Sequence, residues 1–346
     1  MVTKMRRWII LPLIVLITAC RNEAPVATGF VQDDYAYIAS ENRVLVLNIA
    51  DEAEPALVAD VTLPGEVVKV VADGRFLYIA HLPGMLNTVE GPPDTGLQIV
   101  DISDPMQPTR RGFFRAGDFP TDVVVRGDVA YLSEWNLITV VDVSDKDNPS
   151  ATFTITSGAN SLFVSGSRLF ASHGGCSFRT GFCEGTLHIY DVTNPVRPYP
   201  ANNLTIDQLP GHDVAVADDH AFVAGKGVWV VDVADEHSLM VDGRYAVEED
   251  ILFPAKIVIQ GEIGFSLPGD GLHLLDISRP TDPVLLGQYD TDNYLYALSV
   301  QGDTAYLIGW NGLEIVDVAD PANPQQIGSF AFANPVPSAP QPTATP

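Results

Sequence analysis

Gly96-Leu97-Gln98-Ile99-Val100-Asp101-Ile102-Ser103-Asp104-Pro105 is the stretch that decides the fold, because the chain repeats it. It returns almost letter for letter as Gly312-Leu313-Glu314-Ile315-Val316-Asp317-Val318-Ala319-Asp320-Pro321. Looser copies share an apolar run that ends in an acidic or amide residue. The seven marker residues are Asn48, Asp101, Asp142, Asp191, Asp232, Asp276 and Asp317. Their spacings are 53, 41, 49, 41, 44 and 41 residues, so a unit of fixed length with occasional insertions accounts for nearly the whole chain.

Each unit contains four short segments with strand character. In the third unit they are residues 121–125, 129–132, 136–143 and 151–155, which are rich in β-branched and aromatic residues. Runs such as Ile138–Val143 are almost continuously hydrophobic, as is typical of strands buried on both faces. Helical periodicity is absent. Seven units of four strands therefore predict an all-β fold, a seven-bladed β-propeller of four-stranded blades. A linear β-solenoid is the alternative, but its rungs are shorter and less hairpin-like.

The repeated pattern Leu-x-Ile-Val-Asp-Val/Ile-Ser/Ala-Asp-Pro resembles the LVIVD repeat family, predicted propellers on bacterial surface proteins. The resemblance extends from about Val26 to Phe332 and departs from the pattern at Asn48, Asn194 and Arg279. It implies no catalytic residue, because the family carries no established catalytic motif. The repeated aspartates are expected to accept backbone N–H groups in Asx-turns, a role that Asn48 can also fill.

The N-terminus carries a targeting signal. Basic residues Lys4, Arg6 and Arg7 precede the apolar run Trp8–Ala19, which is too short to span a bilayer comfortably. The sequence Ile17-Thr18-Ala19-Cys20 resembles the lipobox of bacterial lipoproteins. The resemblance implies a signal peptide at residues 1–19, lipidation of Cys20 and a short tether at residues 20–25. The alternatives are a plain secretory signal and an uncleaved anchor. We expect an extracytoplasmic protein, lipid-anchored to the cell membrane or outer membrane.

The rest of the chain consists of one predicted domain and a tail. Residues 26–333 form the predicted propeller, and residues 334–346 form a Pro-rich tail that is expected to be disordered. The chain has 44 acidic and 19 basic residues, a net charge of −25, which argues against nucleic acid as a partner. This charge is compatible with cationic partners or a divalent metal ion.

Cys176 and Cys183 lie close together in the sequence. In an extracytoplasmic protein such a pair predicts a local disulfide, with free thiols or metal ligation as alternatives.

Two insertions mark one face of the disc. In units two and four the connection from the second to the third strand grows to about residues 81–96 and 173–185. Both insertions lie in the same type of connection, so both emerge on the same face. We expect a protein or carbohydrate ligand there, because binding loops commonly project from a rigid scaffold. Neutral loop growth is the alternative. Trp135 and Trp310 occupy the same connection and could stack on a ligand.

Aligning the units places polar residues near the mouth of the central channel. They follow the second strand or begin the innermost strand, and they are His81, Glu134, His173, His212, Asp122 and Asp213. Histidine and carboxylate together suit a zinc ion or a general acid–base pair. The alternative is that these residues merely line a wet channel mouth.

These observations favour a monomeric binding or scaffolding module for protein or carbohydrate, with no cofactor needed. The second hypothesis is a metal-dependent extracytoplasmic hydrolase or lactonase with its site at the channel mouth. Propellers support both kinds of function, so the fold does not choose between them. Whether the chain is an enzyme depends on whether His81, Glu134 and His173 reach a common point.

Overall fold

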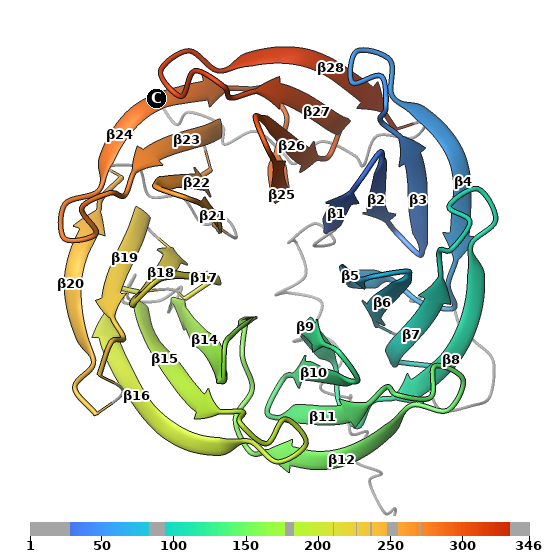
Figure 1. The fold of residues 1–346 in the computed structure, drawn as a ribbon, viewed down its shortest axis with the longest axis horizontal. Helices are drawn as coiled ribbons and strands as arrows, with labels where there is room; N and C mark the ends of the chain where they lie inside the picture. Colours follow the sequence, from blue (N-terminus) through green and yellow to red (C-terminus); the bar gives the residue numbers. More distant parts are fainter. Residues whose placement is uncertain are drawn as a thin grey trace, which may run out of the picture.

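The computed structural model describes residues 28–82, 94–176, 183–209, 211–225, 227–235, 237–247, 255–269 and 271–332. These residues form seven four-stranded antiparallel sheets that are arranged as blades around a central axis (Figure 1). The predicted seven-bladed propeller is therefore confirmed. No helix occurs in the described part of the chain, and so none that is long and apolar enough to cross a membrane.

Each blade is built from four consecutive strands, ordered from the axis outward. Blades one and two contain β1 (Gly29–Gln32), β2 (Tyr35–Ser40), β3 (Arg43–Asn48), β4 (Ala56–Thr62), β5 (Val67–Asp73), β6 (Phe76–His81), β7 (Gly96–Asp101) and β8 (Thr109–Arg115). Blades three and four contain β9 (Pro120–Arg126), β10 (Val129–Glu134), β11 (Ile138–Asp142), β12 (Ser150–Ile155), β13 (Ser161–Ser165), β14 (Arg168–Cys176), β15 (Cys183–Asp191) and β16 (Tyr199–Asp207). Blades five, six and seven contain β17 (Asp213–Ala217), β18 (His220–Gly225), β19 (Gly227–Asp232), β20 (Met240–Tyr245), β21 (Lys256–Gln260), β22 (Ile263–Leu267), β23 (Gly271–Asp276), β24 (Val284–Asp290), β25 (Leu295–Gln301), β26 (Thr304–Gly309), β27 (Gly312–Asp317) and β28 (Gln325–Ala331).

The repeated acidic motif forms the third strand of each blade and the turn that follows it. All seven marker side chains accept a hydrogen bond from the backbone N–H two residues later, at 2.7–3.0 Å. Asp101, for example, accepts from the N–H and the hydroxyl of Ser103, and these bonds lower the pKa of its carboxyl group. The expected Asx-turn role is confirmed, and it explains why Asn48 can replace aspartate.

A β-bulge at one place in every blade shapes the outer strand. The register between the third and fourth strands shifts two residues before the marker position, in all seven sheets. Next to this bulge Gly243 lies so close to the following blade that a Cβ atom would come within 2.4 Å of the carbonyl oxygen of Pro280. Gly287 has the same relation to Pro321. The outer strand of one blade thus packs directly on the turn of the next.

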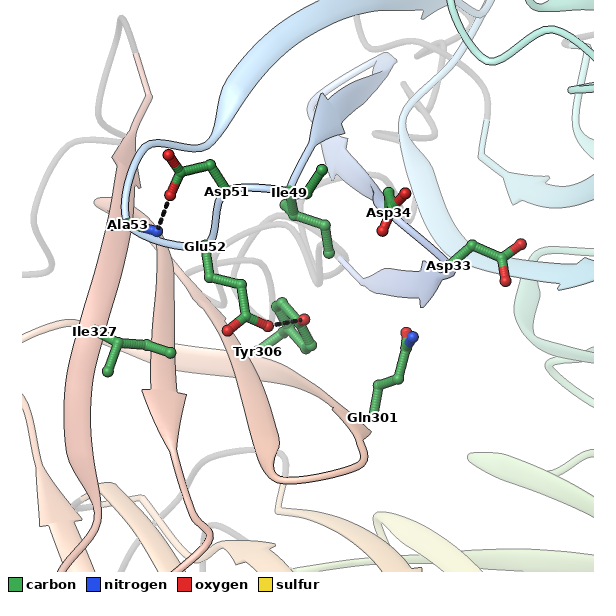
Figure 2. A pocket seen from close by; sticks show the side chains of 10 residues that line it. Asp33, Asp34, Ile49, Asp51, Glu52, Ala53, Gln301, Tyr306 and Ile327 are labelled. Atoms are coloured by element: carbon green, nitrogen blue, oxygen red, sulfur yellow. Dashed lines mark hydrogen bonds between the residues drawn. The ribbon is translucent and has the colours of Figure 1, made fainter.

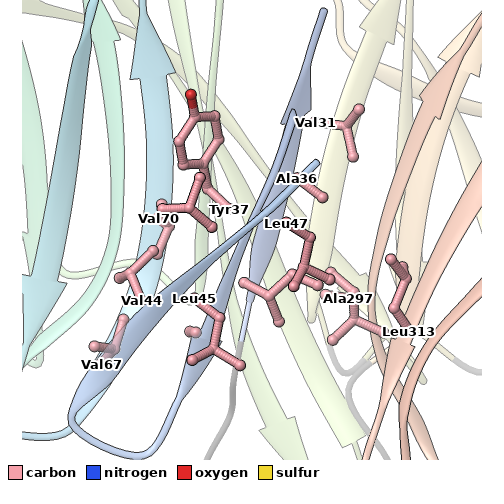
Figure 3. Close-up of a cluster of buried hydrophobic side chains, with 14 of the residues drawn as sticks. Val31, Ala36, Tyr37, Val44, Leu45, Leu47, Val67, Val70, Ala297 and Leu313 are labelled. Carbon is pink, nitrogen blue, oxygen red and sulfur yellow. The ribbon is translucent and has the colours of Figure 1, made fainter. Parts of the chain in front are cut away.

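Within the described residues 28–332 the ring closes by packing, because the first and last blades share no strand. Ala297 and Leu313 of blade seven lie in the same apolar cluster as Val31, Ala36 and Leu47 of blade one (Figure 3). The hydroxyl of Tyr306 adds a hydrogen bond to Glu52 across this seam, at 2.7 Å. Burial of apolar side chains, with one polar contact at the rim, joins the two ends of the chain.

Candidate functional site

The residues that begin the innermost strands connect neighbouring blades. In blade one the Thr28 hydroxyl accepts a hydrogen bond from the backbone N–H of Val70 in blade two, at 2.8 Å. Asp122 accepts in the same way from Leu162 of blade four, at 2.7 Å, and Asp213 from Ile257 of blade six, at 3.1 Å. A side-chain acceptor in blades one, three and five therefore binds the backbone of the next blade.

Side-chain contacts link blade two to blade three and blade four to blade five. The Lys69 ammonium group lies 2.9 Å from a carboxylate oxygen of Asp122, and the Ser161 hydroxyl donates to Asp213 at 2.6 Å. We call this set the inner polar belt; its members are Thr28, Lys69, Asp122, Ser161 and Asp213. It runs from blade one to blade six and ends at blade seven, where the equivalent residue is the buried Ala297.

Charge neutralisation makes this belt possible in a buried place. Asp122 is only 2% exposed. Burial lowers the pKa of Lys69, but the carboxylates of Asp122 and Asp213 raise it by more, so the ammonium group stays charged. The two carboxylates predicted as channel-mouth ligands therefore act as structural links, each with hydrogen bonds to a neighbouring blade.

The second-strand residues predicted as ligands do not share a common point. Glu134 is fully buried and accepts hydrogen bonds from the Asp118 N–H at 2.6 Å and from the Thr139 hydroxyl at 2.5 Å. His81 is also fully buried and stacks on Phe113 with 5.4 Å between ring centroids. Burial lowers the pKa of His81, so its ring is neutral.

The other two histidines predicted as ligands, His173 and His212, lie in different environments. His173 is exposed on β14, whereas His212 lies half-buried next to the inner polar belt. Burial, helped by the nearby charge of Lys256, lowers the pKa of His212 to about 4. Among the described residues, no group of three or more His, Cys, Asp or Glu side chains is placed to hold a metal ion. The metal-site hypothesis thus finds no ligand cluster in this part of the chain.

An exposed pair of aromatic residues lies on blade three instead. Trp135 follows β10 and is 67% exposed, and Phe119 precedes β9 and is 44% exposed. The backbone N–H of Trp135 donates to the backbone carbonyl of Phe119 at 3.0 Å. We call these two residues the open aromatic pair. Beside them, the amide of Asn136 lies 3.4 Å from the carboxylate of Asp118.

The backbone that carries the open aromatic pair is held from two sides. The buried Glu134 side chain fixes the segment before Phe119 by accepting the N–H of Asp118. Gly158 packs so closely that a Cβ atom there would come within 2.4 Å of the carbonyl oxygen of Trp135. The two rings are therefore exposed on a fixed frame.

Blade seven contains the same arrangement in a closed form. The backbone N–H of Trp310 donates to the backbone carbonyl of Tyr294 at 3.2 Å. This bond is equivalent to the one between Trp135 and Phe119. Here the two rings stack on each other, with centroids 4.6 Å apart and planes at 29°. Asn293, at the position of Asp118, is 7% exposed and accepts the N–H of Asn311. Sequence reasoning identified both tryptophans but not this difference, which depends on the aromatic partner of each.

A hollow of about 550 Å³ lies at the seam between blades one and seven (Figure 2). Its lining includes Asp33, Asp34, Asp51, Glu52 and Tyr306. Asp51 accepts the backbone N–H of Ala53, and Glu52 accepts the hydroxyl of Tyr306. Asp51 thus serves the turn and Glu52 the ring closure, so the hollow follows from how the ring is joined.

Several predicted features lie outside the described residues. They are Cys20 and the rest of residues 1–27, the insertion residues 83–93 and 177–182, and the tail at 334–346. Cys176 and Cys183 are direct cross-strand partners in β14 and β15, and Cys183 is 1% exposed. This register places the two residues as the predicted disulfide requires, and the disulfide stays a prediction.

Removing the Asp122 carboxylate should break the inner polar belt. Asp122→Ala leaves the Lys69 ammonium and the Leu162 N–H without their acceptor, so we expect a loss of about 3–5 kcal/mol in the free energy of unfolding. Asp128→Ala is the control, because that side chain is 73% exposed in its contact with Lys146 and should cost less than about 1 kcal/mol. Urea unfolding of both variants measures the difference, and equal losses would contradict a structural role for Asp122.

His212 should make stability depend on pH. Its pKa is about 4 in the folded chain and 6.5 ordinarily, so between these values the unfolded chain binds a proton that the folded chain does not. The free energy of unfolding therefore falls as the pH drops from about 6.5 towards about 4. His212→Gln should flatten this part of the pH profile. His237→Gln is the control, because His237 is 83% exposed and its replacement should leave the profile unchanged. Parallel profiles for the wild-type chain and His212→Gln would refute the assignment.

Comparison with known proteins agrees with this architecture. The LVIVD repeat family matches residues 30–62, 93–114, 120–156, 211–247, 268–291 and 294–331, which together are more than half of the chain. Only blade four, which carries the second insertion, lies outside these matches. No curated protein sequence matches the chain.

Solved structures share the fold at low sequence identity. A protein from Lactobacillus plantarum is 10% identical, with a TM-score of 0.64 over 88% of this chain and 96% of that one. A functionally unknown protein from Desulfotomaculum acetoxidans is 9% identical, with a TM-score of 0.63 over 86% and 95%. Kluyvelomyces marxianus Hsv2 is 11% identical, with a TM-score of 0.55 over 82% and 88%. These similarities concern the fold alone, whereas the repeat matches and the seven blades show that the chain belongs to the LVIVD repeat family.

Proposed function

We propose that this protein is a lipid-anchored extracytoplasmic binding module for a protein or carbohydrate partner. The partner binds the connection face, which we define as the face that carries the connections between the second and third strands. The observation that supports this proposal is the open aromatic pair, Phe119 and Trp135, exposed on the fixed frame of blade three.

Exposed aromatic side chains on a rigid frame favour binding over a purely structural role. A large ring left in water gives up the free energy that its burial would provide. In blade seven the equivalent residues, Tyr294 and Trp310, stack on each other, so the same backbone arrangement can keep its aromatic rings covered. Tryptophan is enriched among the residues that dominate binding energy, and a fixed backbone reduces the entropy lost on association.

The hydrolase hypothesis has weaker support. Asp122 and Asp213 serve as links between blades, and Glu134 holds a neighbouring loop. No observation on the described residues brings a nucleophile, an acid and a base together. We therefore take binding as the function and do not propose a reaction.

Lipid attachment at Cys20 is the basis of the proposed location. We expect the protein isolated from membranes to begin at Cys20 and to carry a diacylglyceryl group, and Cys20→Ser to leave an unprocessed chain. Intact mass spectrometry under non-reducing conditions measures both. The same spectrum should show a mass lower by two hydrogen atoms if Cys176 and Cys183 form the predicted disulfide. An unmodified N-terminus at Cys20 would contradict the anchor without affecting the binding proposal.

Site-specific cross-linking tests the proposed face. A photo-reactive amino acid at Asn136, beside Trp135, should form a cross-linked adduct in cells that naturally produce the protein. The matched position is Asp303, an exposed residue in the turn between β25 and β26 on the opposite face. We expect adducts from position 136 and none from position 303. Adducts of equal yield at both positions, or none at 136, would overturn the assignment of the connection face.

A further inference from the structure

We infer that the open aromatic pair receives an arginine side chain from a basic protein partner. This inference rests on the proposed function and specifies the chemistry of its ligand. Its elements are the exposed side chain of Trp135, the exposed side chain of Phe119, whose backbone is hydrogen-bonded to that of Trp135, and the carboxylate of Asp118.

The carboxylate of Asp118 is held by the residues that follow Asp118 and Trp135 in the chain. One oxygen of Asp118 accepts the backbone N–H of Phe119 at 2.8 Å, and the other lies 3.4 Å from the Asn136 amide nitrogen. These contacts orient the group but leave part of its accepting capacity free, because an ionised carboxylate has about four lone-pair sites. Asp118 is half-buried, so a charged ligand would meet it in a partly desolvated place.

A guanidinium group matches both parts of this arrangement. It is planar and can lie flat on an indole ring, while its N–H groups donate to a carboxylate. A lysine ammonium group forms the same two contacts as a point charge, without the stacking surface or the paired donors. Arginine is therefore the better ligand for a tryptophan beside an aspartate.

The propeller already uses this interaction within its own fold. The guanidinium carbon of Arg244 lies 4.1 Å from the ring centroid of Trp229 in blade five. Arg168 lies over the ring of Phe170 at 5.7 Å, and Arg75 over Phe76 at 5.0 Å. These tryptophan and phenylalanine rings are covered by internal arginines, whereas Trp135 is 67% exposed. An arginine from outside would complete the same contact at Trp135.

The charge of the whole chain favours a basic partner over a neutral one. The net charge is −25, so a basic protein would be attracted from a distance and its encounter rate would rise at low ionic strength. A neutral sugar could stack on Trp135 as well. It would gain nothing from the long-range field and would not depend on the ionisation of Asp118, and this difference separates the two kinds of ligand.

Tryptophan fluorescence of the processed protein in detergent, which begins at Cys20 and therefore lacks Trp8, measures binding directly. Trp135 is the exposed reporter, because Trp229 is 3% exposed and Trp310 is stacked on Tyr294. Three probes are titrated at physiological salt: an arginine-rich peptide, the same peptide with citrulline in place of arginine, and an uncharged oligosaccharide of N-acetylglucosamine. We expect the arginine peptide to bind at least about tenfold more tightly than the citrulline peptide, which has the same shape without the charge.

Variants locate the contact on the surface. Trp135→Ala and Asp118→Asn should each weaken binding of the arginine peptide by about tenfold. Trp310→Ala and Asp303→Asn should leave it unchanged, because the first removes a stacked ring and the second removes an acidic charge from the opposite face. Binding to the Ala and Asn variants is followed by peptide fluorescence anisotropy, so that loss of the Trp135 signal does not hide it.

The alternative outcomes have distinct meanings. Equal losses in Asp118→Asn and Asp303→Asn would show diffuse attraction to an acidic surface and overturn the arginine site. Binding of the oligosaccharide through Trp135, without an effect of Asp118→Asn, would replace the basic partner by a carbohydrate and leave the proposed function intact. Failure of every probe would overturn the arginine inference, and the proposed function itself would fall only if position 136 also gave no adduct in cells.

Discussion

No blade of this propeller can bury both of its faces alone, and the rest of the structure depends on that constraint. Each four-stranded sheet packs its apolar faces on two neighbours, so stability comes from interfaces between blades as well as from hydrogen bonds within them. The polar groups that accompany this packing also act between blades. The Lys69–Asp122 ion pair and the bond from Ser161 to Asp213 connect sheets that apolar packing already holds together. Residues that resembled candidate catalytic groups in the sequence are therefore part of the fold.

Local features were predictable from the sequence because their causes lie within a few residues. The Asx-turns follow from an aspartate or asparagine and the N–H two residues later, as at Asn48 and Asp101. The seven-fold repeat predicted the blades, and alignment of the units placed Asp122 and Asp213 near the start of the innermost strand. The backbone groups that these two carboxylates bind lie about forty residues away in the next blade, so no local pattern indicated them. Glu134 was expected to face a channel mouth but instead accepts hydrogen bonds from Asp118 and Thr139. These partners are near in the sequence, but the direction of the Glu134 side chain depends on the packing of the blade.

The two aromatic pairs show how one framework can serve different purposes. Trp135 and Trp310 donate equivalent backbone hydrogen bonds to the residue before the innermost strand. In blade seven that residue is Tyr294, whose ring covers the indole, and in blade three it is Phe119, whose ring remains in water. The repeat thus supplies the position, and the few residues around it decide whether the site closes on itself or stays available to a partner.

The seam between blades one and seven has a mechanical consequence. The described chain begins at Thr28 and ends at Phe332, and both residues belong to the two blades that meet there. The inner polar belt stops at Ala297, so this joint relies on apolar packing and the contact between Tyr306 and Glu52. A pull on either end of the propeller therefore acts first on this joint, which the inner polar belt does not cross. Under tension the ring would open at this joint, while the other six interfaces between blades stayed closed.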